Sequence, residues 1–135
     1  MKNYIVYELN GQITKTGQCV DFDFNLQGQN VIEGFANDAT QYIVNKQIVN
    51  MPPKPDGAAY FDYDKKQWVL DYPTQEAIVK KQRDELLYKS DWTQISNNPL
   101  TPAKQEEWAI YRQQLRDITQ QPGYPFNVVW PTKPE

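Results

Sequence analysis

The chain has 135 residues and a formal net charge of −3, and it contains no histidine and a single cysteine, Cys19. Without histidine there is no Ser-His-Asp or Cys-His catalytic system, and one cysteine cannot build an intrachain disulfide, a zinc finger or an iron–sulfur cluster. The acidic balance offers no basic footprint to nucleic acid. Composition therefore favours a protein without catalytic activity, metal, cofactor or nucleic-acid partner.

The first apolar run of the sequence covers only residues 4–7. That run is too short for a signal peptide or a membrane span. We therefore expect a soluble protein made in a reducing cytoplasm, without a membrane partner. Its length is typical of one domain or two very small ones.

The first part of the chain has the alternation and the turn residues of β-strands. Residues 4–9 and 12–16 flank Asn10 and Gly11. An Asn-Gly pair accepts the two positive φ angles of a type I′ turn, so the segment predicts a hairpin. Residues 20–24 then alternate apolar and acidic side chains, as in a strand with one buried face. A looser stretch is expected after this strand.

A second strand pair is predicted at residues 42–44 and 47–49, joined by Asn45 and Lys46. Beyond it, residues 52–55 include three prolines, which exclude a helix and favour an extended crossing.

A third hairpin is predicted after the prolines, from residues 58–63 and 68–70. The turn between them contains Asp64, whose side chain suits the opening position of a type I turn.

The apolar period changes from two to about 3.6 after residue 73. Thr74 is the expected N-cap of a first helix that extends to about residue 89. A second helix is expected to begin with Thr101 as its N-cap and Pro102 at its first position. Its apolar stripe is formed by Trp108, Tyr111, Leu115 and Ile118.

These elements predict an α+β protein. An N-terminal antiparallel β region and a β-hairpin are followed by a two-helix hairpin with an extended C-terminal arm. We place the boundary at residue 73, so that residues 1–73 form a β-rich domain suited to docking and residues 74–135 a helical domain.

Two Asp-x-Asp pairs, Asp21 with Asp23 and Asp62 with Asp64, have too few ligands for a dedicated metal site. Solvated strand faces and turn capping explain them better, and Cys19 is expected to be a semi-buried filler rather than a reactive thiol.

The basic side chains of the two predicted helices have acidic neighbours in sequence, so we expect a solvated, mixed-charge surface. The basic members are Lys80, Lys81, Arg83, Arg112 and Arg116, and the acidic ones are Asp84, Glu85 and Asp117.

The apolar arm after the second helix has two interpretations. Phe126, Val128 and Trp130 could fold back over the groove between the helices. Alternatively, the arm could dock on a partner as an extended ligand, because Trp and Tyr residues often anchor interfaces.

The C-terminal half resembles the tail assembly chaperone domain of tailed bacteriophages over about residues 76–134. The matching segments occur in order at the expected separations and are residues 83–87, 90–94, 98–100, 108–118 and 121–131. The hairpin from Phe61 to Val69, with the prolines before it, is similar to a β module found upstream in such proteins.

The resemblance implies a non-enzymatic phage protein that binds a tail or tail-fibre polypeptide, or other tail components of the virion, in the host cytoplasm. It brings no catalytic residues, and the aromatic positions expected to bind the partner are Trp92, Trp108, Tyr111, Tyr124, Phe126 and Trp130. Two alternatives remain: a structural adaptor retained in the baseplate, tail tip or tail fibre, and a glycan-binding host-recognition protein.

Overall fold

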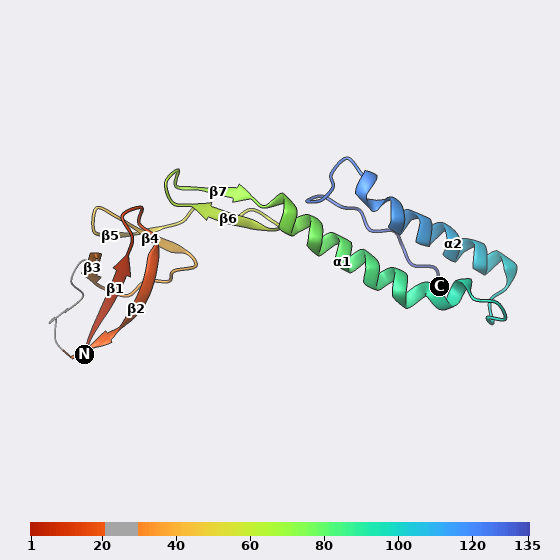
Figure 1. Ribbon diagram of the computed structural model, residues 1–135, viewed down its shortest axis with the longest axis horizontal. Coiled ribbons are helices and arrows are strands. Elements are labelled where there is room, and N and C mark those ends of the chain that lie inside the picture. The colour runs from red at the N-terminus through yellow and green to blue at the C-terminus, as the bar shows by residue number, and fades with distance from the viewer. Residues whose placement is uncertain (21–29) are drawn as a thin grey trace. The chain divides into compact units, whose positions relative to one another are not determined.

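The computed structural model describes residues 1–20 and 30–135, and the predicted α+β class is confirmed: antiparallel strands come first and two helices follow (Figure 1). The described residues form two compact units, residues 1–55 with 59–69 and residues 56–58 with 70–135. The predicted strand at 20–24, apart from Val20, lies outside the described residues, and so does the Asp21–Asp23 pair.

The first unit contains a three-stranded antiparallel sheet with the order β2-β1-β3. Its central strand is β1 (Lys2–Tyr7), flanked by β2 (Ile13–Cys19) and β3 (Asn30–Glu33). The predicted hairpin of β1 and β2 is confirmed, whereas β3 was not predicted from the sequence. Residues 30–33 are too short to show a period of their own, and pairing with β1 holds them as a strand.

The β1–β2 turn differs from the predicted type I′ geometry. Glu8 and Gln12 close a three-residue loop, with the Glu8 amide 2.8 Å from the Gln12 carbonyl oxygen, and only Gly11 has a positive φ, of 93°. Such loops place a glycine in the left-handed conformation next to a bulge. A Cβ atom on Gly11 would lie 2.2 Å from the carbonyl oxygen of Ile43, so glycine is also required by the close approach of another strand.

The second predicted hairpin is confirmed as β4 (Gln41–Val44) and β5 (Gln47–Asn50). Asn45 and Lys46, the two loop residues, have φ angles of 50° and 62°. Two successive positive φ values are those of a type I′ turn, which therefore occurs here and not at Asn10-Gly11.

The core of the first unit is built by side chains from several strands and loops. Its buried members are Ile5, Ile13, Ala36 and Ile43, with Tyr7 and Ile32 packed against them. Ile5 and Ile13 come from neighbouring strands of the sheet, and Ile43 brings β4 onto it.

The third hairpin consists of β6 (Ala59–Asp62) and β7 (Gln67–Leu70). Phe61 is the centre of an aromatic cluster, with ring centroids 5.3 Å from Tyr42 and 5.4 Å from Trp68. The turn is capped by Asp62 and not, as predicted, by Asp64: one Asp62 carboxylate oxygen accepts from the amide of Asp64 at 3.0 Å. The residue that caps the turn is therefore Asp62, the last residue of β6.

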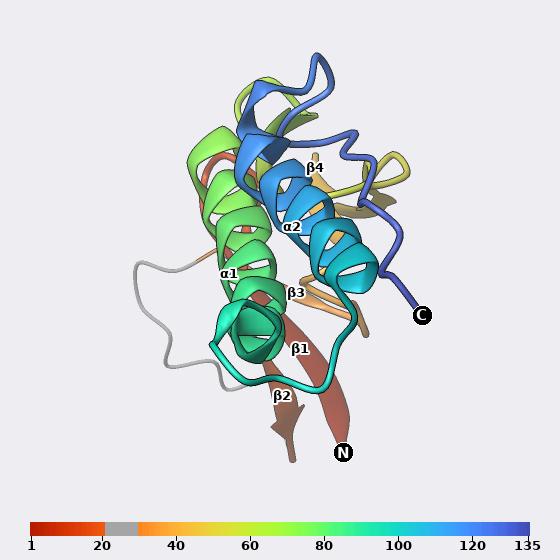
Figure 2. The ribbon, with the colours of Figure 1, turned by 90° about the vertical axis from the view of Figure 1, so that its right-hand side faces the viewer.

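The second unit is a helical hairpin formed by α1 (Tyr72–Ser90) and α2 (Pro102–Arg116), which lie side by side in Figures 1 and 2. Short 3₁₀ helices follow them, η1 (Asp91–Gln94) and η2 (Asp117–Gln120). The predicted caps of α2 are confirmed, with Thr101 at the N-cap and Pro102 first in the helix.

The N-cap of α1 is Asp71, three residues before the predicted Thr74. The Asp71 carboxylate accepts from both the amide and the hydroxyl of Thr74, at 3.2 and 2.7 Å. Thr74 thus takes part in the cap as a donor within the first turn, and Pro73 lies inside the helix, where a missing amide is tolerated.

The core of the second unit is aromatic and aliphatic and joins both helices. The buried members are Trp108, Tyr111 and Leu115, with Leu86, Leu87, Leu100 and Trp130 packed against them. Since Trp130 belongs to the C-terminal arm, this end of the arm folds back onto the helices. Figure 1 shows the arm passing along the helical pair toward the C-terminal end of α1.

Candidate partner-binding site

The junction between α1 and η1 is fixed by Arg112 from α2. Its Nη1 donates to the carbonyl oxygen of Leu87 at 2.6 Å and to Oγ of Ser90 at 2.8 Å, and its Nη2 donates to Asp91 at 2.8 Å. The last carbonyl groups of a helix lack intrahelical partners and carry partial negative charge, which a guanidinium group satisfies. Arg112 is 8% exposed, so its predicted place on a solvated face is wrong.

The same junction positions Trp92 within η1. The Ser90 hydroxyl donates back to the Leu86 carbonyl oxygen at 2.8 Å, and the Thr93 hydroxyl donates to the Ser90 carbonyl oxygen at 2.6 Å. Thr93 is almost fully buried, whereas Trp92 between these two anchors is 44% exposed. The backbone on both sides is therefore held while the indole ring remains accessible.

Three of the predicted site residues lie together at this junction. The ring centroid of Trp108 is 5.9 Å from that of Trp92 and 5.7 Å from that of Tyr111. Trp108 and Tyr111 are only 6% and 4% exposed, so they form the core side of the group and Trp92 its open side. Burial raises the pKa of Tyr111, which keeps its hydroxyl neutral.

The other three predicted residues lie on the arm. Trp130 packs against the cluster that contains Trp108, but Phe126 contacts Tyr72 at the beginning of α1, with ring centroids 4.9 Å apart. Burial raises the pKa of Tyr124, and the nearby Glu76 carboxylate adds to this effect. The six residues are therefore divided between the two ends of α1.

A cavity of about 140 Å³ opens beside Trp92. It is lined by Leu86, Lys89, Ser90, Trp92, Trp108, Tyr111 and Lys133, and we call it the aromatic pocket. The ammonium group of Lys133 lies 5.9 Å from the centroid of the Trp108 ring, within reach of a cation–π interaction.

Sequence reasoning missed the two lysines of the pocket. The spacing of Lys89 and Trp92, three residues apart near a helix end, was the available signal for Lys89. No local pattern indicates Lys133, because it reaches the pocket only through the path of the arm.

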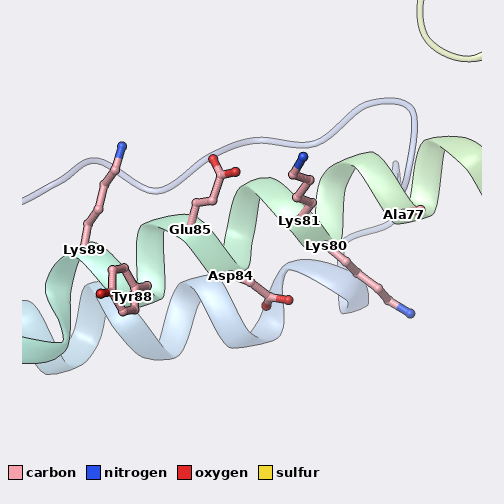
Figure 3. A pocket seen from close by; sticks show the side chains of 7 residues that line it. All are labelled: Ala77, Lys80, Lys81, Asp84, Glu85, Tyr88 and Lys89. Carbon is pink, nitrogen blue, oxygen red and sulfur yellow. The ribbon is translucent and has the colours of Figure 1, made fainter.

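A second, larger hollow lies on the outer face of α1, with a volume of about 590 Å³. Figure 3 shows that Lys81 and Glu85 point to one side of the helix, and Lys80 and Asp84 to the other. Each side therefore carries both signs of charge. Lys80 also pairs with Glu76 at 2.8 Å, which raises the pKa of Lys80 and lowers that of Glu76. We call this hollow the outer groove. Because side chains of both charges line it, it does not favour a ligand of either charge.

Other kinds of site are not supported in the described ranges, 1–20 and 30–135. No group of three or more His, Cys, Asp or Glu side chains there is placed to hold a metal ion. Within the same residues, no helix has the length and apolar character needed to cross a membrane.

The C-terminal unit is thus a helical hairpin whose apolar arm packs back onto it, with an accessible aromatic pocket at one end. Residues 75–135 match the family model described as phage tail assembly chaperone protein. The match confirms the resemblance inferred from the sequence over this segment, which contains both helices and the arm. Neither a curated protein nor a solved structure matches the chain.

Proposed function

We propose that the protein is a non-enzymatic assembly chaperone that binds a phage tail or tail-fibre polypeptide in the host cytoplasm. The observation that carries this proposal is that residues 75–135, which match the chaperone family, hold the aromatic pocket. A half-exposed tryptophan above a rigid aromatic core suits the anchoring of an apolar segment.

The mechanism we infer is the shielding of apolar surface on an incomplete tail polypeptide. Transiently exposed apolar surface and unpaired strand edges make such chains prone to aggregate until assembly buries them. Trp92 presents the accessible contact, while Trp108 and Tyr111 support it from the core. On the arm, Tyr124, Phe126 and Trp130 pack on the helical unit but are only partly buried, and we assign their remaining surface to the same partner contact.

The β-rich N-terminal domain, residues 1–73, is the part that we assign to docking on other tail components of the virion. Among the residues that the structure describes, β2 and β3 are the outer strands of its sheet, and we assign to their outer edges the addition of an extended segment. In this scheme residues 74–135 hold the client chain.

The first test is quantitative mass spectrometry of this chain in purified phage particles and in the infected-cell lysate. A chaperone is expected to be abundant in lysate and absent from particles. A fixed copy number per particle would instead identify a structural adaptor in the baseplate, tail tip or tail fibre.

The second test is co-expression of the full chain with each tail and tail-fibre protein of the same phage. The proposal predicts that the soluble fraction of at least one of them increases and that the two chains co-purify. Binding on a glycan array without any such effect would support a host-recognition role.

A further inference from the structure

The aromatic pocket has the size of one aromatic ring. Its volume is about 140 Å³, and an engineered apolar cavity of roughly 150 Å³ is known to bind benzene. Leu86, Trp92, Trp108 and Tyr111 supply walls of the kind that a phenyl ring contacts favourably. A phenyl side chain therefore fits the pocket both in size and in the character of its walls.

The charged side chains that line the pocket are all basic. Lys89 and Lys133 line it, and no acidic side chain does. Neither lysine forms an ion pair with another residue in the described ranges, whereas Lys80, Arg83, Lys104 and Arg112 of the same unit are all paired. Two unpaired ammonium groups beside an apolar cavity favour a ligand that brings negative charge next to its apolar part.

We propose that the aromatic pocket binds a phenylalanine side chain of the partner polypeptide that is flanked in sequence by acidic residues. The phenyl ring enters the cavity that Trp92 and Trp108 line together with Leu86, and the neighbouring carboxylates pair with Lys89 and Lys133. This inference rests on the proposed function, because it names the segment of the client chain that the C-terminal unit holds.

Two features of the surroundings support an inserted side chain over a flat contact. The floor of the pocket is rigid, since Trp108 and Tyr111 belong to the core and Arg112 fixes the adjoining helix end. The wall at Trp92 is accessible, with 44% of the residue exposed. A preformed pocket lowers the ordering cost of binding. The outer groove of α1, with mixed charges, lacks this selectivity.

The test uses the full chain and a blocked heptapeptide, acetyl-Gly-Ser-Glu-Phe-Asp-Ser-Gly-amide. Binding is followed by NMR through the indole N–H signals of Trp92 and Trp108, with Trp68 in the first unit as an internal reference. We expect a dissociation constant in the millimolar range, selective shifts of the two pocket signals, and weaker binding at high salt.

Three comparison peptides separate the parts of the proposal. Replacing the phenylalanine by alanine is expected to abolish the shifts. Replacing the two acids by glutamine and asparagine is expected to weaken binding several-fold. A peptide that ends in phenylalanine with a free carboxylate is expected to bind no better than the blocked peptide; tighter binding would mean that the pocket takes chain ends, and would overturn the proposal.

Variants of the chain locate the binding. Trp92→Ala is expected to weaken peptide binding at least tenfold. Lys89→Gln and Lys133→Gln are each expected to weaken it about two- to fivefold. Lys81→Gln, the same change on the outer groove, is the matched control and is expected to have no effect. The lysine variants test the proposal even if Trp92→Ala disturbs the fold, and equal binding by both lysine variants and the control would overturn it.

Capture of tail proteins distinguishes this inference from the proposed function. If a tail or tail-fibre protein binds the chain but the heptapeptide causes no shifts at 10 mM, a concentration about tenfold above a millimolar dissociation constant, the pocket inference is wrong and the proposed function stands. If the peptide binds as described but no tail protein does, the pocket inference stands and the proposed function fails.

Discussion

The side chain of Gln121 pairs with both backbone groups of Val129. Its Nε2 donates to the Val129 carbonyl oxygen at 2.7 Å, and its Oε1 accepts from the Val129 amide at 2.8 Å. The side-chain amide of one glutamine thus forms the two hydrogen bonds that a neighbouring strand would form, and it fixes the arm at the end of η2. Gln75, in the first turn of α1, acts similarly, accepting from the Ala58 amide and donating to the Pro125 carbonyl oxygen.

Removing this pairing is expected to loosen the arm without unfolding the helices. In Gln121→Ala two hydrogen bonds are lost, each worth about 1 kcal/mol. Because Val129 is itself 76% exposed, little apolar burial opposes local opening. We expect faster hydrogen exchange at the Val129 amide with nearly unchanged exchange in the centre of α2. Gln120→Ala, at an exposed neighbouring position, is the control; equal effects of both variants would contradict this role.

Arg112 is expected to contribute more to stability than the other arginines of the helices. Arg112→Ala leaves the Leu87 carbonyl group and Ser90 without their donor and removes the partner of Asp91. The expected loss is about 2–4 kcal/mol in the free energy of unfolding, measured by urea denaturation.

The matched control is Arg116→Ala, because Arg116 is exposed near the end of the same helix. Its expected cost is below about 0.5 kcal/mol. Similar costs for both arginine variants would show that the buried contacts of Arg112 add nothing to the stability.

Local sequence signals predicted the beginning and the buried face of α2 well, because certain residue types are strongly preferred at those positions. Thr101 followed by Pro102 marked the beginning of α2, and the period of Trp108 and Leu115 marked its buried face. The aromatic group at the α1–η1 junction was partly predictable for the same reason, since its members are large rings on these elements.

The wrong or missing predictions have a different cause, because they concern contacts between residues that are far apart in the sequence. The role of Arg112 was missed because its partners are 21 to 25 residues away, and a charge pattern shows only sequence neighbours. The type I′ turn was assigned to Asn10-Gly11 because glycine favours it, but Gly11 is needed there for its contact with Ile43. Lys133 reaches the pocket through the fold of the arm, which no local rule predicts.

Gly11 is therefore expected to be intolerant of any side chain. Gly11→Ala combines a φ of 93° with a Cβ atom 2.2 Å from the Ile43 carbonyl oxygen. We expect a loss of more than about 1 kcal/mol in the stability of the first unit. Hydrogen exchange in β1 and β4 would report this loss while α1 and α2 serve as an internal control. Unchanged protection in both strands would contradict the contact.

Trp108 and Trp92 are expected to differ sharply although their rings are neighbours. Trp108→Ala empties a core position and is expected to cost about 3–5 kcal/mol. Trp92→Ala removes a ring from a residue that is 44% exposed and is expected to cost about 1 kcal/mol, while weakening partner binding. Thermal denaturation with a co-purification assay measures both effects. An unchanged melting curve for Trp108→Ala would show that its ring is not part of the core.

Tyr111 is expected to make the helical unit sensitive to alkaline pH. Burial raises the pKa of its hydroxyl in the folded chain above the ordinary value of about 10. The folded state then binds the proton more tightly than the unfolded state, so the stabilisation is complete below pH 10 and is lost as the pH rises through the folded pKa. Tyr111→Phe cannot ionise and is expected to show a smaller decrease in unfolding free energy between pH 9 and pH 11. Tyr88→Phe is the control, because Tyr88 is 80% exposed. An alkaline profile of Tyr111→Phe identical to that of the unchanged chain would show that another group is responsible.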